Sequence, residues 1–416
     1  MRIPVVMMII MLLGSVLVDL YITSDIRKSA KKPFWWKIYL VSAVLCWLFM
    51  AVVLCLPRRS ESSDILPVMW MLYSIITVYV AKLVYVVFSL IGKLIRSFTK
   101  RKSGNHPMQW VGTGVAVFVF GAMWWGVGKT RHEIVVTHED ITSPKVPLPF
   151  NGYKIAQISD IHVGTWGKDT AFISALVDSV NSLHPDLIVF TGDIVNRRTD
   201  EVVPFIPVLS RLHAPDGVLS ILGNHDYGDY VDWKDPQDRV KNNQKLADYQ
   251  KDMGWDLLNN RKVFVTRGND SIMVVGVENV GDPPFPTYGD LDLALSPSPD
   301  SLYNQNDHHY KILLTHNPEH WNKYVSHNTN IDLSLAGHTH AMQMMFKLGD
   351  WVWSPAKYRY EQWGGMYDRL NENGHMTKLY VNIGAGEVGM PSRLFAAYPE
   401  ITLLTLYHQT QHREMN

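Results

Sequence analysis

The sequence predicts two parts of different fold class: an α-helical transmembrane bundle with four spans, followed by an α/β domain. Apolar residues dominate the chain up to about residue 128, whereas the remainder of the 416 residues mixes apolar runs with charged and turn residues. Four apolar stretches in the first part are each near or above the ~18 residues that a membrane-spanning helix requires. After Lys154, short β-branched runs alternate with helical patterns, which is typical of α/β domains. We therefore divide the chain into a transmembrane module (1–128), a linker (129–150) and the α/β domain (151–416).

The four apolar stretches are predicted as membrane-spanning helices, since a buried soluble bundle rarely needs four helices of such length. The third contains Lys82, so either the span ends near Ala81 and an interfacial helix follows, or the lysine snorkels or faces the bundle. A cleaved signal peptide is the alternative for the first stretch, but no small-x-small cleavage motif precedes Asp19. The spans are expected at about Ile3–Ile22, Ile38–Leu56, Ile65–Ile91 and Trp110–Val127.

Positive charge is distributed unequally over the connecting loops, and this bias sets the orientation of membrane proteins with short loops. The second loop has only Arg58 and Arg59, accompanied by Glu61 and Asp64. The first loop carries Arg27, Lys28, Lys31, Lys32 and Lys37, and the third carries Lys93, Arg96, Lys100, Arg101 and Lys102. We expect loops one and three to be cytoplasmic, so both termini and the α/β domain lie outside the cytoplasm of a multi-pass protein of the cell (inner) membrane.

Charge and cysteine content limit the partners and the metal chemistry. The 39 basic and 39 acidic residues balance, so nothing indicates a nucleic-acid partner. Cys46 and Cys55 both lie in the apolar part, so the α/β domain has neither disulfides nor thiolate ligands. Any metal in that domain must be bound by nitrogen and oxygen atoms.

Six short apolar runs in the second part are predicted as strands because of their length and β-branched content. Between the first two, Phe172, Leu176, Val180 and Leu183 recur at helical spacing, which predicts an amphipathic crossover helix. The runs are Lys154 to Ser159, Asp186 to Thr191, Val218 to Leu222, Ile272 to Val277, Lys311 to Thr315 and Ile331 to Ala336.

Polar clusters follow five of these strands. Ligands of open α/β sheets bind outside the carboxyl ends of strands, so we expect the clusters to converge on one crevice. A one-residue spacing within a cluster is compatible with extended backbone, in which alternate side chains face the same side. The clusters are Ser159-Asp160-Ile161-His162, Gly192-Asp193, Gly223-Asn224-His225-Asp226, His316-Asn317 and Gly337-His338-Thr339-His340.

The residue types in these clusters indicate a metal site. Carboxylate, imidazole and amide oxygen together suit divalent metals such as Mn, Fe or Zn. Seven candidate donors exceed the needs of one tetrahedral site but suit two metals that share a carboxylate, an arrangement used for displacement at phosphorus. Gly192, Gly223 and Gly337 each precede a candidate ligand, where a tight turn or a close backbone approach favours glycine.

The five clusters, in this order, resemble the motifs of the calcineurin-like metallophosphoesterase superfamily over about Lys154 to Leu406. The resemblance is greatest to its bacterial secreted or membrane-tethered phosphodiesterases, which share a late glycine-rich strand end such as Asn382–Gly386. One departure is Ala341-Met342-Gln343, where many relatives have Gly-Gly-Gln; this puts the shape of the substrate rim in doubt. The resemblance implies a two-sheet β sandwich flanked by helices, with two metals at the sheet ends.

The resemblance also implies a role for each donor. One metal is expected at Asp160, His162 and His340, the other at Asn224, His316 and His338, with Asp193 between them and His225 as the acid that protonates the leaving oxygen. Two cations and two carboxylates leave a charge of about +2, which suits an anionic phosphate but depresses the pKa of His225. Asp226 is a candidate for the carboxylate that compensates for this effect, and equally a candidate for a structural cap.

These features predict a membrane-anchored dimetal phosphodiesterase that uses metal-bound hydroxide to attack an envelope or lipid-like phosphate ester. One alternative is a hydrolase of UDP-2,3-diacylglucosamine, although that substrate is cytoplasmic and the loop charges argue against it. Another is a non-catalytic sensor or scaffold with structural metals, although every ligand position is filled. The aromatic residues of segment 351–363 are expected to line a substrate rim, touch the membrane interface or pack against the domain. The oligomeric state is not predicted.

Overall fold

The computed structural model describes residues 5–29, 32–99, 107–283, 285–296 and 308–409. The chain forms two compact units, one of residues 1–128 with 389–392 and one of residues 129–388 with 393–416. The first unit contains four long helices and the second contains the sheets, so the predicted fold class is confirmed for both parts.

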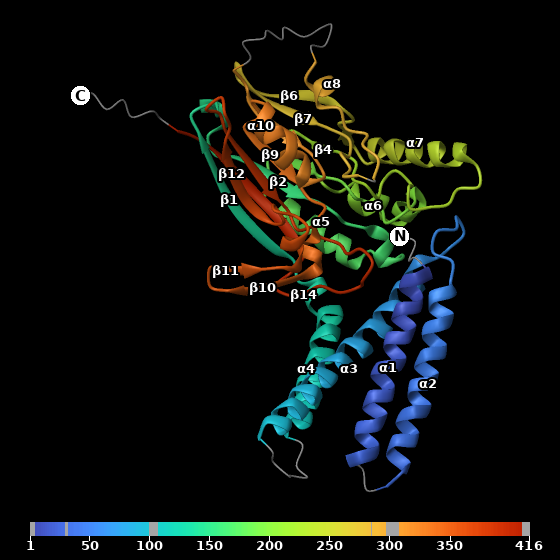
Figure 1. Ribbon diagram of the computed structural model, residues 1–416. Coiled ribbons are helices and arrows are strands. Elements are labelled where there is room, and N and C mark those ends of the chain that lie inside the picture. The colour runs from blue at the N-terminus through green and yellow to red at the C-terminus, as the bar shows by residue number, and fades with distance from the viewer. Residues whose placement is uncertain (1–4, 30–31, 100–106, 284, 297–307, 410–416) are drawn as a thin grey trace. The chain divides into compact units, whose positions relative to one another are not determined.

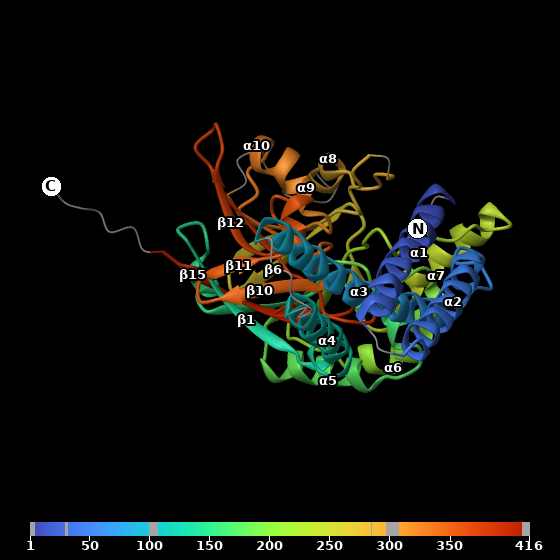
Figure 2. The same ribbon diagram turned by 60° about the horizontal axis from the view of Figure 1, so that its bottom comes forward.

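In the first unit, all four helices are long and apolar enough to cross a membrane. Helices α1 and α2 lie side by side, as do α3 and α4 (Figures 1 and 2). Of the basic loop residues that predict the orientation, Lys31, Lys100, Arg101 and Lys102 lie outside the described residues. The helices are α1 (Val5–Ser29), α2 (Phe34–Cys55), α3 (Ile65–Thr99) and α4 (Pro107–Gly128).

Lys82 faces the interior of the helical bundle. Helix α3 continues through it to Thr99 without a break. The Lys82 ammonium donates to Asp19 Oδ1 at 2.7 Å, and the Asp19 side chain is fully buried. Three further groups donate to the same carboxylate: Tyr39 Oη at 2.5 Å, Trp47 Nε1 at 2.8 Å and Tyr79 Oη at 2.9 Å. The lysine therefore belongs to a hydrogen-bonded cluster that joins α1, α2 and α3.

A second buried carboxylate of α1 has a similar environment. Asp25 accepts from Lys93 Nζ at 2.7 Å, from Ser89 Oγ at 2.5 Å and from Gln109 Nε2 at 3.2 Å. Since Gln109 belongs to α4, the two clusters together connect all four helices.

Two six-stranded sheets dominate the second unit (Figure 1). Strands β2 to β5 run parallel in the first sheet, and β7, β8, β9 and β13 run parallel in the second. The first sheet has the order β1 (Val135–Ser143), β15 (Glu400–His408), β2 (Tyr153–Ile158), β3 (Leu187–Phe190), β4 (Val218–Ser220), β5 (Trp255–Leu257). The second has the order β12 (Gly365–Leu370), β13 (Met376–Val381), β9 (Leu333–Ala336), β8 (Tyr310–Leu314), β7 (Asp270–Gly276), β6 (Arg261–Arg267). A small third sheet has the order β11 (Trp351–Trp353), β10 (Met344–Leu348), β14 (Leu394–Phe395).

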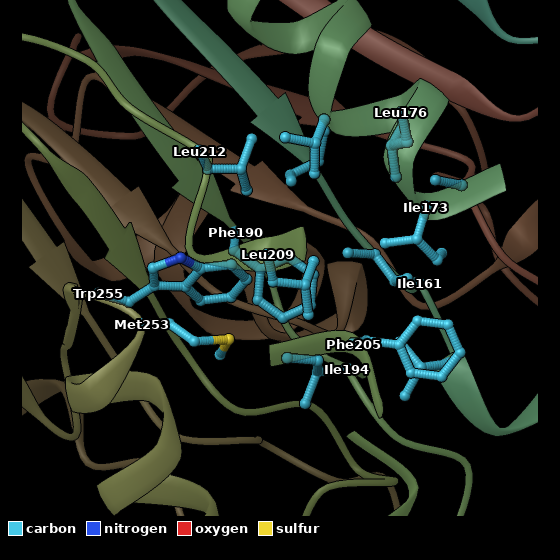
Figure 3. Packing of buried hydrophobic residues seen from close by; sticks show 14 of the residues in the cluster. Ile161, Ile173, Leu176, Phe190, Ile194, Phe205, Leu209, Leu212, Met253 and Trp255 are labelled. Atoms are coloured by element: carbon cyan, nitrogen blue, oxygen red, sulfur yellow. The ribbon is translucent and has the colours of Figure 1, made fainter. Parts of the chain in front are cut away.

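The two large sheets pack face to face and carry helices on their outer faces. The core between them includes Ile155, Leu187, Ile312 and Leu335. Figure 3 shows the outer core of the first sheet, where Leu176 of α5 packs with other apolar side chains. The helices are α5 (Ala171–Ser182), α6 (Ile206–Leu209) and α7 (Pro236–Asp252) by the first sheet, and α8 (Leu291–Leu295), α9 (Pro318–His320) and α10 (Ser326–Asn328) by the second. Short helical turns are η1 (Thr130–His132), η2 (Leu148–Phe150), η3 (Val163–Trp166), η4 (Thr199–Phe205), η5 (Trp321–Val325), η6 (His340–Gln343) and η7 (Pro355–Tyr358).

All six predicted strands are confirmed to within two residues at each end, as is the crossover helix α5. The segment 129–150, which we expected to be a linker, contains β1, which pairs in parallel with β15 from Val135 to Ser143. This strand is at the sheet edge and mostly half-exposed or exposed, so its polar residues carry little hydrophobic signal.

Candidate metal centre

The strand ends of both large sheets place carboxylates and histidines together. Asp160, His162 and His340 form one group of donors, and Asp193, His316 and His338 form another. Within each group, the donor atoms lie within 4.8 Å of one another. The first sheet supplies Asp160, His162 and Asp193, and the second supplies the other histidines, so the site requires both sheets.

Asp193 lies between the two groups. Its Oδ2 is 3.4 Å from His162 Nε2 and 3.2 Å from His316 Nε2. Asn224 joins the second group, since its Oδ1 lies 3.2 Å from His316 Nε2. The seven side chains expected from the sequence are thus neighbours, with one carboxylate oxygen close to both groups.

The backbone at these residues differs from our expectation. We expected extended backbone at Asp160-x-His162 and His338-x-His340, but φ is +51°, +45°, +76° and +51° at the four residues, respectively. Each strand ends in left-handed turns that bring the side chains over the sheet edge. Such conformations are strained for residues other than glycine, and they concentrate at functional sites.

Two glycines permit close contacts around the carboxylates. A side chain at Gly223 would overlap the Asp193 carboxylate, and one at Gly337 would overlap Ser159 and Asp160. The expected close approach is therefore present at both positions.

The histidine tautomers follow from their second hydrogen bonds. His162 Nδ1 lies 3.1 Å from the Val195 carbonyl, and His316 Nδ1 lies 2.7 Å from the Thr191 carbonyl. Because a carbonyl only accepts, each Nδ1 carries hydrogen and each Nε2 can offer its lone pair to the site. Lone pairs of imidazole, carboxylate and amide therefore converge, and this donor set fits divalent cations.

Burial and the attraction between carboxylates and histidines set the protonation states of this site. Burial favours neutral carboxyls, but His316 and His225 hold the pKa of Asp193 well below its usual range. Burial likewise opposes the ionised form of Asp160, but His340 holds the pKa of Asp160 below its usual range. Burial also opposes the charged form of His316, but Asp193 raises its pKa to about 10. The carboxylates are thus ionised, and His316 must release a proton when its Nε2 binds a cation.

His225 lies beside the donor groups with one nitrogen occupied by the backbone. Its Nδ1 donates to the Asn196 carbonyl at 2.6 Å, so Nε2 is the atom that can accept or deliver a proton. Burial lowers the pKa of His225, whereas the sequence led us to expect this effect from the positive charge of bound cations.

The Asp226 carboxylate supports backbone amides and not the side chain of His225. Its carboxylate accepts from the amides of Asp193 at 2.8 Å, Ile194 at 3.0 Å, Val195 at 3.2 Å and Gly223 at 2.9 Å. Burial, followed by repulsion from Asp193, raises the pKa of Asp226 to about 7. Of the two roles considered for Asp226, these contacts favour the structural cap.

Two tyrosines next to the donors were not among the predicted site residues. The Tyr230 ring stacks on His225 with centroids 4.3 Å apart, and its hydroxyl accepts from Asn224 Nδ2 at 2.8 Å. The Tyr360 hydroxyl lies 3.0 Å from His338 Nε2. No motif marks Tyr230, whereas Tyr360 belongs to the aromatic segment 351–363, whose role the sequence left open.

Four helices long and apolar enough to cross a membrane, together with a sandwich that clusters metal donors, define a membrane-integral protein with a candidate metal site. Comparison with known families specifies the class further. The family described as "Probable Calcineurin-like phosphoesterase, transmembrane domain" matches residues 1–131, and "Calcineurin-like phosphoesterase" matches residues 153–342. The chain belongs to the calcineurin-like metallophosphoesterases, which usually bind divalent metals, and is a metal-dependent phosphoester hydrolase.

Three relatives illustrate the range of similarity. The chain is 30% identical over 282 residues to the uncharacterized metallophosphoesterase YkuE of Bacillus subtilis, covering 66% of this chain and 86% of that protein. It is 26% identical over 349 residues to a transmembrane protein with metallophosphoesterase domain of Danio rerio, covering 80% and 72%. A stretch of 97 residues is 41% identical to the UDP-2,3-diacylglucosamine pyrophosphatase LpxG of Chlamydia trachomatis, covering 23% of this chain and 29% of that protein.

Proposed function

We propose that this protein is a phosphodiesterase with two divalent metals that cleaves an envelope or lipid-linked phosphate ester. The observation that carries the proposal is Asp193 Oδ2, which lies within 3.4 Å of a histidine nitrogen from each donor group. A carboxylate in this position is suited to bridging two cations.

In this proposal, each donor group binds one cation of Mn, Fe or Zn. Asp160, His162 and His340 would hold the first cation, Asn224, His316 and His338 would hold the second, and Asp193 would serve both. When bound, the cations would supply a nucleophilic water at neutral pH and neutralise the phosphate. Two carboxylates against two divalent ions leave a net charge of about +2, which favours an anionic substrate.

His225 is proposed to deliver the proton to the leaving oxygen. The Asn196 carbonyl fixes its tautomer and Tyr230 stacks on its ring, so Nε2 keeps one orientation. The lowered pKa of His225 means that a bound phosphate anion is needed to hold the proton on Nε2.

The substrate class rests on the tether to the membrane. Val135 begins β1 only seven residues after Gly128 ends α4, so the catalytic domain cannot move far from the bilayer. The loop charges favour an extracytoplasmic domain at the inner membrane. Phosphate esters of lipids or other envelope components are therefore the proposed substrates.

A second candidate function is hydrolysis of a nucleotide-linked lipid. The 97-residue stretch that is 41% identical to LpxG favours it. This function requires a cytoplasmic domain, because the substrate is cytoplasmic, so a tag at the carboxyl terminus that is protected from external protease would favour it.

The proposal is tested with purified full-length protein, bis-p-nitrophenyl phosphate and Mn²⁺. We expect hydrolysis that EDTA abolishes, that Asp193→Ala abolishes, and that His213→Ala at an exposed position leaves unchanged. If the protein bound two metals but did not hydrolyse the ester, the result would instead support a non-catalytic sensor or scaffold with structural metals. Parallel assays with the monoester p-nitrophenyl phosphate distinguish a phosphodiesterase from a phosphatase.

A further inference from the structure

The two donor groups are supported by different kinds of partner. In the first group, the backbone carbonyl of Val195 orients His162, and Asp160 accepts from the His338 amide at 3.0 Å. In the second group, the Thr191 carbonyl orients His316 in the same way, but Asn224 and His338 each contact a tyrosine hydroxyl. We propose that Tyr230 and Tyr360 are positioning residues that set the affinity of the second metal site without affecting the first. The inference rests on the ligand assignment of the proposed function.

Tyr230 determines which end of the Asn224 amide faces the site. The amide has one donor end and one acceptor end, and only its oxygen can bind a cation. Since the Tyr230 hydroxyl accepts from Nδ2 at 2.8 Å, Oδ1 is directed toward His316 Nε2 at 3.2 Å. Without the hydroxyl, the amide is free to rotate and present its hydrogens to the cation.

Tyr360 has the corresponding role at His338. The His338 Nδ1 faces the donor group, 3.3 Å from His316 Nε2, whereas its Nε2 lies 3.0 Å from the Tyr360 hydroxyl. If Nδ1 gives its lone pair to a metal, Nε2 carries the hydrogen and the hydroxyl accepts it. A partner of this kind fixes both the tautomer and the ring orientation, and its loss typically costs ~10–100-fold in metal affinity.

The role of the two tyrosine hydroxyls can be tested by changing each tyrosine to phenylalanine, because the aromatic ring is kept. Both are half-exposed, Tyr230 in the loop after β4 and Tyr360 shortly after η7. A change to phenylalanine removes only the hydroxyl and keeps the ring contacts with His225 and with His338. Tyr358 is the matched control, since it lies in the same segment with 77% of its surface exposed.

The experiment titrates metal-free full-length protein with Mn²⁺ by calorimetry and counts retained Mn after gel filtration in metal-free buffer. We expect two binding events in the wild-type protein. Tyr230→Phe and Tyr360→Phe should each weaken one event by about 10–100-fold and leave the other unchanged. The double variant should retain one metal, and Tyr358→Phe should behave like the wild type.

The outcomes separate this inference from the proposed function. A wild-type protein that binds two metals, with both events unchanged or equally weakened in the phenylalanine variants, overturns the positioning role alone. A wild-type protein that binds fewer than two metals overturns the dimetal function and this inference with it. Melting temperatures of the metal-free variants, expected to match the wild type, show whether a loss of affinity reflects unfolding.

Discussion

The buried carboxylates of the helical unit and of the metal centre have opposite environments. Asp19 accepts from a lysine, two tyrosines and a tryptophan, so hydrogens surround it and Lys82 neutralises its charge. Asp193 instead faces the Nε2 atoms of two histidines whose other nitrogens already donate to carbonyls. A buried charge needs a compensating partner. For Asp19 this partner is Lys82. For Asp193 it is His316, which must release a proton when a cation binds, and the donor set around Asp193 is suited to cations.

The largest effect is expected at the bridging carboxylate. Asp193→Ala removes the oxygen proposed to contact both cations, so both metals and nearly all hydrolysis should be lost. Metal analysis and the hydrolysis of bis-p-nitrophenyl phosphate measure this. Asp178→Ala, at a side chain that is 61% exposed, is the control and should change neither. Full activity in Asp193→Ala would refute the bridging role.

His225→Ala should separate metal binding from proton transfer. We expect both metals to remain and kcat to fall by about 10²-fold or more, because a general acid contributes that much. The defect should be smaller with p-nitrophenyl esters than with alkyl esters, since p-nitrophenolate leaves without a proton. An equal defect for both leaving groups would argue against the acid role.

Breaking the Asp19 cluster should affect stability and spare the metal centre. Asp19→Asn leaves the Lys82 charge, whose side chain is 16% exposed, without its carboxylate, and loss of one partner of a buried ion pair costs up to about 3–5 kcal/mol. Thermal unfolding of the full-length protein in lipid nanodiscs measures the change, with the exposed Lys28→Met as the control. The variant that removes both charges, Asp19→Leu with Lys82→Met, should recover part of the loss. A change in metal content in Asp19→Asn would contradict the division between the two regions.

Removing both metals should destabilise the protein to a similar extent. Ligand present at 100 times its dissociation constant stabilises the folded state by about 2.7 kcal/mol per site. We therefore expect EDTA to lower the melting temperature of the wild-type protein and to leave that of Asp193→Ala unchanged. An equal EDTA effect in both proteins would show that chelation acts elsewhere.

The comparison also shows why the sequence predicted some features and missed others. The ligand clusters could be predicted because each follows a recognisable strand. Binding sites of α/β sheets form at the carboxyl ends of strands, so this prediction did not need the contacts between side chains. Tyr360 and His338 belong to separate segments whose meeting depends on loop conformation, so no spacing could indicate their contact. The partner of Lys82 was equally unpredictable, since it lies on another helix 63 residues away. Strand β1 was missed because an edge strand with polar residues resembles a linker.

The smallest expected effect concerns backbone strain, which also distinguishes the two regions. All non-glycine residues with positive φ in the described parts of the chain lie in the second unit, and they include Ala341, Met342 and Gln343. Ala341 and Met342 stand where the resemblance noted in the sequence leads us to expect two glycines, yet the backbone keeps the left-handed conformation that favours glycine. The departure noted in the sequence thus introduces local strain.

Met342→Gly should therefore stabilise the protein slightly. Met342 has φ +47° and ψ +31° with 41% of its surface exposed, so little packing is lost with its side chain. Removing the strain of one left-handed residue stabilises the folded state by about 1–2 kcal/mol. The greater freedom of glycine in the unfolded chain offsets about 0.5–1 kcal/mol of this gain. We expect a net gain of about 0.5 kcal/mol in thermal unfolding, whereas Met345→Gly, within strand β10, should destabilise. A loss of more than about 1 kcal/mol in Met342→Gly would mean that the methionine side chain stabilises the rim next to His340 through packing.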